Sequence, residues 1–92
     1  MRGILHCGTG IGMVITANKV PGICTAVCHD PYSAERSRMS NDCQIMTLGS
    51  RVIGEGLAKS LVKIWLEAEF QGGRSTPKVE RIKAIECQFH SL

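Results

Sequence analysis

One cysteine, Cys7, ends a short apolar run and is followed at once by a glycine-rich stretch. Gly8, Gly10 and Gly12 alternate with other residues there, so the backbone can approach a ligand closely and leave N–H groups free to face an anion. A thiol near the start of a helix has its thiolate form favoured, and a thiolate acts as a base or as a nucleophile. The stretch therefore predicts a site that holds a phosphate, or that stabilises a developing enolate oxygen beside a reactive thiol.

The residues of this stretch also allow two other interpretations. A cysteine at the end of a strand is commonly a small buried apolar side chain, and the glycines can form a tight turn. The G-x-G start, with Asp30 about twenty residues later, is also the beginning of a dinucleotide-binding pattern. The spacing here is G-x-G-x-G, and Met13 stands where that pattern has Gly or Ala, so the agreement with dinucleotide binding is weak.

Apolar runs and helical patterns alternate along the chain, in the order strand, helix, strand, helix, strand, helix, helix. Strands are predicted at 3–7, 22–28 and 43–48, and helices at 11–20, 31–39, 54–70 and from Thr76 onward. Asp30 and Thr76 each precede a proline and are predicted to be N-caps. This alternation predicts an α/β fold, a Rossmann-like parallel sheet with flanking helices.

The two last helices carry apolar side chains at helical spacing. In the helix at 54–70 one apolar stripe is formed by Leu57, Leu61 and Trp65. In the final helix three apolar side chains are expected to point inward, namely Val79, Ile82 and Ile85. No repeat or linker interrupts the chain, so residues 1–92 are expected to form one domain, with 74–92 as a C-terminal helix and tail.

Composition argues against several classes of partner. The net charge is +3 and the chain has only one Trp, one Tyr and two Phe, which offers little for binding nucleic acid. No apolar run approaches the roughly 20 residues that cross a membrane, and the first residues lack the pattern of a signal peptide. The five cysteines are odd in number and lack C-x-x-C spacing, which is typical of free thiols in a reducing compartment. We therefore expect a cytoplasmic protein.

The remaining candidate ligands predict no metal site. Cys24 and Cys28 on one strand would be about 13 Å apart, and His29 adds only one further ligand, so zinc is not expected. His29 is expected to be a solvated loop histidine near the ligand edge of the sheet. His6 precedes Cys7 on the same strand, and strand alternation is expected to point it to the face opposite the thiol.

Five segments follow one another in a fixed order: "CGTGIGM", "ANKVPGI", "SND", "LGSRVIG" and "EFQGGR". Together they resemble the type B ribose-5-phosphate isomerase family, which includes galactose-6-phosphate and allose-6-phosphate isomerases. The resemblance spans residues 3–86. It implies an enzyme that interconverts aldose and ketose phosphates through a cis-enediolate, without a metal or other cofactor. It also implies a homodimer or a higher homo-oligomer, because the family's site is shared between subunits.

The resemblance assigns roles to individual residues. Cys7 corresponds to the thiol that moves a proton between C1 and C2 of the sugar, and Thr9 belongs with it to the catalytic loop. The backbone that stabilises the enediolate oxygens is matched by Gly8, Thr9, Gly10 and Gly12. Asn41 corresponds to a residue that contacts the sugar from the partner subunit. Arg51 and Arg74 correspond to arginines that lie near the phosphate. These roles agree with the chemistry of a thiolate, of N–H groups and of guanidinium forks.

Two positions depart from the family's pattern. Ser40 stands where many relatives have a histidine that assists opening of the sugar ring, and a serine cannot cycle a proton near neutral pH as imidazole does. Lys78 stands where many relatives have a second phosphate-binding arginine, so the charge is kept but the bidentate fork is lost. The substrate preference is expected to differ accordingly.

The resemblance covers only the C-terminal portion of the family's fold. About two βα units, roughly 60 residues that help to form the substrate pocket, have no counterpart here. We therefore expect the first strand to have an exposed edge, and the 92-residue chain to show little isomerase activity by itself. The alternatives are an inactive remnant that serves as a phosphate-binding or interaction module, and a dinucleotide-binding half-domain.

Overall fold

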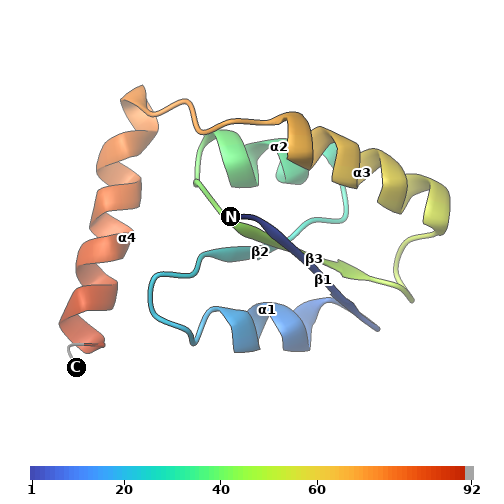
Figure 1. Ribbon diagram of the computed structural model, residues 1–92, viewed down its shortest axis with the longest axis horizontal. Helices are drawn as coiled ribbons and strands as arrows, with labels where there is room; N and C mark the ends of the chain where they lie inside the picture. The colour runs from blue at the N-terminus through green and yellow to red at the C-terminus, as the bar shows by residue number, and fades with distance from the viewer. Residues whose placement is uncertain (91–92) are drawn as a thin grey trace.

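Three parallel strands form the middle layer of the computed structural model, which describes residues 1–90 (Figure 1). β1 (Gly3–Cys7) and β2 (Thr25–Val27) both pair with β3 (Ile45–Gly49), so the order of the sheet is β1-β3-β2. The register places Cys7 beside Gly49. Because the strands are parallel, their carboxyl ends reach one edge of the sheet and their amino ends reach the opposite edge.

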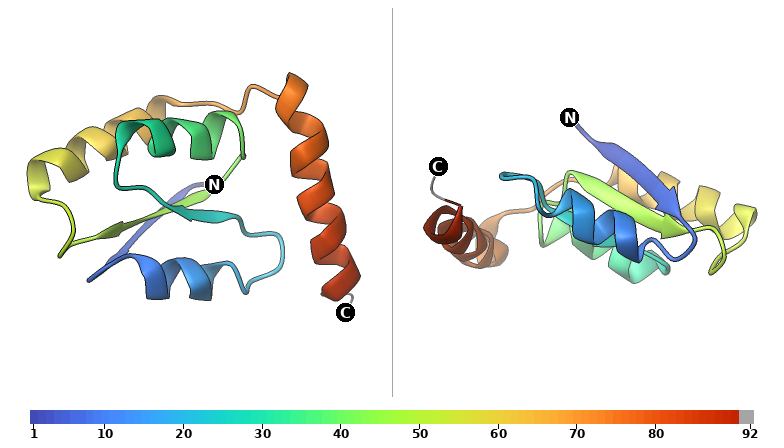
Figure 2. Two further views of the ribbon diagram at one scale, coloured as in Figure 1. Left: turned by 180° about the vertical axis from the view of Figure 1, so that it is seen from behind. Right: turned by 90° about the horizontal axis from the view of Figure 1, so that it is seen from below.

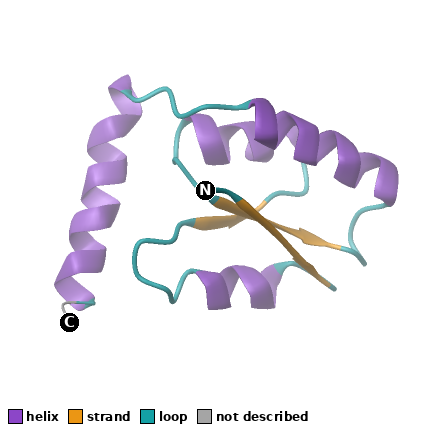
Figure 3. Ribbon diagram, viewed as in Figure 1, coloured by secondary structure: helices purple, strands orange, loops and turns teal. Residues whose placement is uncertain are grey.

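Helices cover both faces of this sheet (Figure 2). α1 (Ile11–Ala17) lies on one face, and α2 (Pro31–Met39) and α3 (Glu55–Glu67) pack together on the other. A short 3-10 turn, η1 (Gly73–Ser75), leads into α4 (Thr76–Phe89), which stands apart at the amino edge of the sheet (Figure 3). The predicted α/β fold, with a parallel sheet and flanking helices, is confirmed. Across residues 1–90, none of the helices combines the length and the apolar character needed to span a membrane.

Several predicted boundaries differ from those observed. The helix predicted to reach residue 20 ends at Ala17, where the side chain of Asn18 turns to the backbone of Thr25. Asn18 Nδ2 donates to the Thr25 carbonyl oxygen at 2.9 Å, and Oδ1 accepts from the Thr25 N–H at 2.7 Å. The strand predicted from residue 43 begins at Ile45, because the Cys43 N–H is bonded back to α2 at 2.8 Å. Side-chain and loop hydrogen bonds that residue patterns do not reveal therefore shorten the elements.

The two predicted N-caps have different outcomes. Asp30 caps α2 as predicted, since its Oδ2 accepts the N–H of Ser33 at 2.8 Å. The prediction for Thr76 is wrong, because Ser75 occupies the N-cap position and no side chain caps α4. β2 is also shorter than the predicted strand 22–28, and α3 ends at Glu67 rather than at residue 70.

The core lies between the sheet and the pair formed by α2 and α3. It consists of six buried side chains in mutual contact: Cys28, Ala34, Met46, Leu48, Leu61 and Trp65. Leu61 and Trp65 belong to the predicted apolar stripe of α3, and both are completely buried. Leu57, on the first turn of the same helix, is 40% exposed. Burial of an apolar side chain of this size contributes roughly 2 kcal/mol, so this layer holds α2 and α3 on the sheet.

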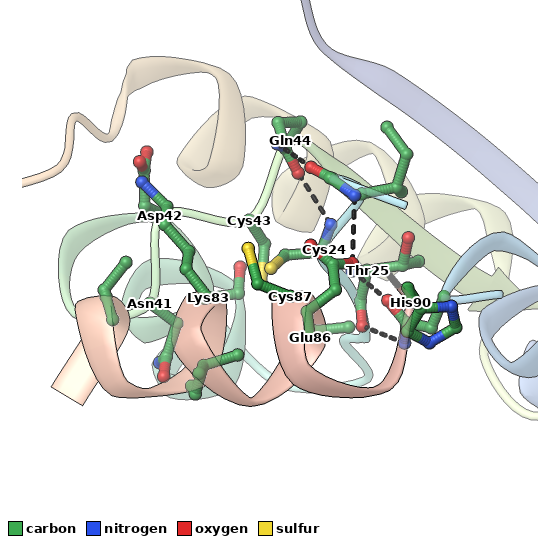
Figure 4. A pocket seen from close by; sticks show the side chains of 17 residues that line it. Cys24, Thr25, Asn41, Asp42, Cys43, Gln44, Lys83, Glu86, Cys87 and His90 are labelled. Carbon is green, nitrogen blue, oxygen red and sulfur yellow. Dashed lines mark hydrogen bonds between the residues drawn. The ribbon is translucent and has the colours of Figure 1, made fainter. Parts of the chain in front are cut away.

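α4 is only loosely attached to the rest of the chain. Val79 is buried, but Ile82 and Ile85 are 46% and 47% exposed, so the prediction that all three point inward is wrong for the last two. The helix stands beside the amino edge and not on a face of the sheet, so its apolar stripe does not pack against a sheet face. Glu86 anchors it by accepting the N–H of Gly22 at 2.9 Å. A cavity of ≈ 800 Å³ lies between α4 and the sheet edge (Figure 4), and the end of the predicted tail, 91–92, is outside the described residues.

β1 has a neighbour on one side only. In the described part of the chain it pairs with β3 alone, and its alternate residues Ile4 and His6 are exposed. The exposed edge expected for this strand is confirmed. An unpaired edge presents N–H and C=O groups that another strand can bond.

Arg2 ties the start of β1 to the end of α3. Its guanidinium lies 5.7 Å from the centroid of the Trp65 ring, and it donates to the carbonyl oxygens of Leu66 at 2.8 Å and Ala68 at 2.9 Å. Carbonyl groups at the end of a helix have no partner within the helix and carry its partial negative charge. Arg2 also pairs with Glu69 at 3.3 Å, but that carboxylate is 82% exposed and contributes little.

Replacing Arg2 with Ala is expected to lower the free energy of unfolding by about 2 kcal/mol, because two charge-assisted hydrogen bonds are lost. Urea unfolding followed by the fluorescence of Trp65 measures the change. Glu69→Gln is the matched control and is expected to change the free energy by about 0.5 kcal/mol or less. Equal effects of the two substitutions would contradict this role of Arg2.

Candidate functional site

The glycine loop folds back on the thiol of Cys7 at the carboxyl edge of the sheet. Gly10 has a φ of 80°, in the left-handed region, and its N–H donates to the Cys7 Sγ at 3.1 Å. Its carbonyl oxygen accepts from Thr47 Oγ1 at 2.9 Å, so the loop is held on the sheet. A β-carbon on Gly10 would lie 3.0 Å from Val27 Cγ2 and 3.1 Å from Thr47 Oγ1. Both the backbone conformation and the close contacts therefore require glycine here.

Backbone N–H groups of the loop and of the first turn of α1 lower the pKa of the Cys7 thiol below its ordinary value of 9.0. The N–H of Met13 has the largest effect, and those of Gly10, Thr9 and Gly12 add to it, whereas desolvation of the sulfur acts in the opposite direction. Hydrogen bonds to the charged form favour that form, so the thiolate is stabilised. This agrees with the reactive thiol expected from the residues.

Three other thiols, of which one is half-buried and two are buried, have the opposite tendency. Burial raises the pKa of Cys24 and Cys28, and it raises the pKa of Cys43 to about 12. Cys28 and Cys43 are buried, and both fit the interpretation of a cysteine as a small apolar side chain. Cys7 is only half-buried, and its thiolate is favoured, so it does not fit that interpretation.

The end of β3 and the turn after it pack against the glycine loop. The Ser50 N–H donates to the Cys7 carbonyl oxygen at 2.8 Å. Gly49 lies so close to Thr9 that a β-carbon on Gly49 would be 2.7 Å from the Thr9 carbonyl carbon. Gly49 is absent from the predicted site residues, because its contact with Thr9 depends on strand register. The only signal for it in the sequence is a glycine directly after an apolar run.

Arg51 is the predicted phosphate ligand that the structure brings to the loop. Its N–H donates to the Gly8 carbonyl oxygen at 2.9 Å, and its exposed side chain passes Gly8, where a β-carbon would lie 3.5 Å from Arg51 Cδ. Thr9 is exposed, and its Oγ1 accepts the N–H of Ile11 at 3.2 Å. Gly12 is exposed in the first turn of α1 with open space around its Cα. These residues and Cys7 lie together at the carboxyl edge of the sheet.

His29 has a different environment from the one predicted. It is half-buried, and its Nε2 accepts the N–H of Gly49 at 2.9 Å. The prediction of a solvated loop histidine is therefore wrong. The strand register places Gly49 beside the histidine, and residue spacing does not show this.

Ser40 and Asn41 lie at the other edge of the sheet. They follow α2 and precede β3, which places them at the amino ends of the strands. Arg36 fixes both of them: its Nη1 donates to Ser40 Oγ at 2.9 Å, and its carbonyl oxygen accepts from Asn41 Nδ2 at 2.8 Å. Asn41 lines the cavity beside α4, where Figure 4 shows it below Asp42. Neither residue meets Cys7 within this chain.

Arg74 and Lys78 share that amino edge. Arg74 lies in η1, Lys78 lies in the first turn of α4, and both side chains are exposed. Figure 1 shows this segment beside the end of α2, away from the carboxyl end of β1. The predicted phosphate ligands are therefore divided, with Arg51 at the carboxyl edge and the other two at the amino edge.

The structure offers little to a dinucleotide at Asp30. Hydrogen bonds from Ser33 hold its carboxylate as the cap of α2 and lower its pKa. A ribose would have to compete with that cap. For metals, residues 1–90 contain no group of three or more His, Cys, Asp or Glu side chains placed to hold an ion.

The sequence matches the Ribose/Galactose Isomerase family over residues 1–82. The chain belongs to this family. A D-erythrulose-4-phosphate isomerase of Pectobacterium atrosepticum is 62% identical over 87 residues, which are 95% of this chain and 57% of the relative. A Ribose-5-P isomerase B of Listeria innocua is 60% identical over 85 residues, which are 92% of this chain and 57% of the relative. The resemblance drawn from the five sequence segments is thereby confirmed.

Solved structures of the family have the same fold. Ribose-5-Phosphate Isomerase B of Clostridium thermocellum is 53% identical and superposes with a TM-score of 0.93, over 96% of this chain and 60% of that chain. The type B ribose 5-phosphate isomerase of Trypanosoma cruzi is 43% identical with a TM-score of 0.91, over 95% of this chain and 59% of that one. The chain thus spans little more than half the length of the family members it matches.

Alkylation of the native chain is expected to occur at Cys7 at lower pH than at the buried thiols. The thiolate is the reactive form, and a lowered pKa populates it at lower pH, whereas Cys43 with a pKa of about 12 stays protonated. Iodoacetamide labelling across a pH series, resolved by peptide mass spectrometry, measures each cysteine. Half-maximal labelling of Cys7 above pH 9.0, its ordinary pKa, would contradict the arrangement of its loop.

Proposed function

We propose that this chain supplies the proton-transferring half of an aldose–ketose isomerase that acts on a phosphorylated sugar. The observation that carries the proposal is the Cys7 sulfur facing the backbone N–H groups of its loop. A thiolate base and a developing enediolate both need such donors, because each carries negative charge. Membership of the Ribose/Galactose Isomerase family supports the same class of reaction.

In the proposed mechanism the Cys7 thiolate removes the proton from C2 of the open-chain aldose. The electrons of that C–H bond form the C1–C2 double bond of a cis-enediolate, and O1 takes up negative charge. Transfer of the O2 proton to O1 and return of the carbon proton from Cys7 to C1 then give the ketose. The N–H groups of Gly8, Gly10 and Gly12 stabilise the charged oxygens, and Thr9 adds a hydroxyl beside them. The carbon-bound proton leaves the sugar and returns to it. C1 is reduced and C2 is oxidised within the same molecule, so no separate redox partner takes part.

The other half of the site is proposed to come from a second copy of the chain. Asn41 and Cys7 lie at opposite ends of the sheet, and a strand of five residues is about 16 Å long. In a two-fold dimer the amino edge of one copy can meet the carboxyl edge of the other. Each site then combines one copy's Cys7 and Arg51 with the partner copy's Ser40, Asn41, Arg74 and Lys78. Residues 1–92 are proposed to act as one domain, with 74–92 as its C-terminal helix and tail.

Ser40 bears on the size of the substrate. A pentose 5-phosphate spends much of its time as a ring, and opening that ring needs a group that moves a proton. A four-carbon ketose 4-phosphate has its terminal hydroxyl esterified and cannot close such a ring. A serine hydroxyl, unlike an imidazole, does not act as both proton donor and proton acceptor by titrating near neutral pH. We therefore propose that this site favours the open-chain four-carbon substrate. The Pectobacterium relative, named a D-erythrulose-4-phosphate isomerase, is consistent with this choice.

The 92-residue chain is expected to isomerise its substrate only slowly by itself, and replacing Cys7 with Ser is expected to reduce that rate at least about 100-fold, because the base is lost while the loop is kept. Exchange of solvent deuterium into C1 or C2 is measured with D-erythrulose 4-phosphate and with ribose 5-phosphate. Higher exchange is expected for the four-carbon sugar. Cys87→Ser is the matched control, since that thiol is exposed on α4, and is expected to leave exchange unchanged.

Three outcomes would contradict parts of this proposal. Full exchange in the Cys7→Ser chain would remove Cys7 as the base. Protection of Cys7 from alkylation by a sugar phosphate, without any exchange, would favour the inactive phosphate-binding module. Protection by NAD and not by a sugar phosphate would favour the dinucleotide-binding half-domain.

Mixing two inactive variants is expected to restore activity if the site is shared. Cys7→Ser and Asn41→Ala each spoil both sites of their own dimer, but a mixed dimer keeps one intact site. Random exchange of subunits should then recover about one quarter of the natural rate. The measurement is the exchange rate after unfolding and refolding the variants together, against each refolded alone. A mixture no more active than its components would contradict a shared site.

A further inference from the structure

We propose that His29 is a positioning residue for the Cys7 base, because its imidazole holds the end of β3 against the loop that surrounds the thiol. Its Nε2 accepts the N–H of Gly49 at 2.9 Å, and Gly49 pairs with Cys7 across the sheet. The inference deepens the proposed function and rests on it, since it concerns the residue proposed as the base.

The Gly49 N–H points to the side of β3 that β2 covers. In a parallel ladder, alternate residues of a central strand bond to the same neighbour. The N–H of Ile45 donates to the carbonyl oxygen of Cys24, just before β2, at 3.4 Å, and the carbonyl oxygen of Thr47 accepts from the N–H of Cys28, just after β2, at 3.1 Å. Gly49 is the next residue of this series, but β2 has ended and the chain turns away into α2. The imidazole of His29 takes the place of the carbonyl group that a longer strand would have supplied.

A loss of this acceptor would be transmitted to the thiol. Gly49 is buried, and a buried N–H without an acceptor is costly, so the strand end would move to find one. The contact of Gly49 with the Thr9 carbonyl group leaves no space for that movement unless the loop moves as well. The next residue, Ser50, is bonded to the Cys7 carbonyl oxygen. The N–H groups that face the sulfur would therefore lose their alignment.

The backbone on both sides of His29 is fixed, which directs the side chain to Gly49. Cys28 before it is completely buried and belongs to the core. Asp30 after it caps α2 through Ser33. Because Nε2 accepts a hydrogen bond, the neutral ring carries its proton on Nδ1. A side chain of similar reach with an acceptor at the same place should therefore replace the histidine.

The test compares two variants of similar size, His29→Gln and His29→Leu. The Gln amide oxygen reaches about as far as Nε2 and can accept the Gly49 N–H, whereas Leu has no acceptor. The readout is the rate at which iodoacetamide alkylates Cys7, followed on its peptide from about pH 6 to about pH 10. At about pH 7, Leu is expected to slow alkylation about threefold or more, which corresponds to a rise of about half a unit in the thiol pKa, and Gln is expected to restore the rate.

His6→Gln is the matched control, because His6 is an exposed histidine on β1, and it is expected to leave the rate unchanged. Equal rates in the natural chain and in both His29 variants would overturn the inference. Equal slowing by Gln and Leu would also overturn it, since the acceptor would then not matter. If circular dichroism shows that the Leu variant does not fold, His29→Asn replaces it, because its oxygen falls short of Gly49, and the same outcomes apply.

The alkylation rate does not depend on turnover, so failure of this inference and failure of the proposed function are distinguishable. If Cys7→Ser kept its exchange activity while His29→Leu slowed alkylation, Cys7 would be rejected as the base and the positioning of its thiol by His29 would stand. If Cys7→Ser abolished exchange while the His29 variants alkylated at the natural rate, the base would stand and the positioning role would be rejected.

Discussion

The hydrogen bond from the Gly10 N–H to the Cys7 sulfur is the interaction on which the rest of the site depends. It exists because Gly10 adopts a left-handed conformation that turns the loop back over the thiol, and because the Thr47 hydroxyl holds the carbonyl group of Gly10 in place. With that turn made, several N–H groups of the loop face one sulfur and favour its thiolate. A base and an anion-stabilising loop therefore arise from the same few residues.

The parallel sheet imposes a second constraint. It gathers Cys7, Gly49 and Arg51 at the carboxyl edge and leaves Asn41 at the amino edge, a full strand length away. A single chain of this topology cannot join the two groups, since its strands all run in one direction. The loose attachment of α4 at the amino edge has the same origin, because a helix beside a sheet edge finds no face to cover.

Chains of contacts between distant residues hold the carboxyl edge together. Gly49 touches Thr9 and receives its acceptor from His29, which is 20 residues away in sequence. Arg2 performs a comparable function at the start of β1, where it bonds the last carbonyl groups of α3. In both places a side chain completes backbone hydrogen bonding that a regular element leaves unfinished.

The sequence by itself determined the alternation of strands and helices, the cap at Asp30 and the glycine loop after Cys7, because each depends on residues close together in the chain. It did not determine that Ile82 and Ile85 stay exposed, that His29 bonds Gly49, or that Arg51 and Arg74 lie at different edges. Those features depend on strand order, on register and on where a helix finds room to pack. Only the tertiary structure decided them, since it alone brings residues twenty or more positions apart into contact.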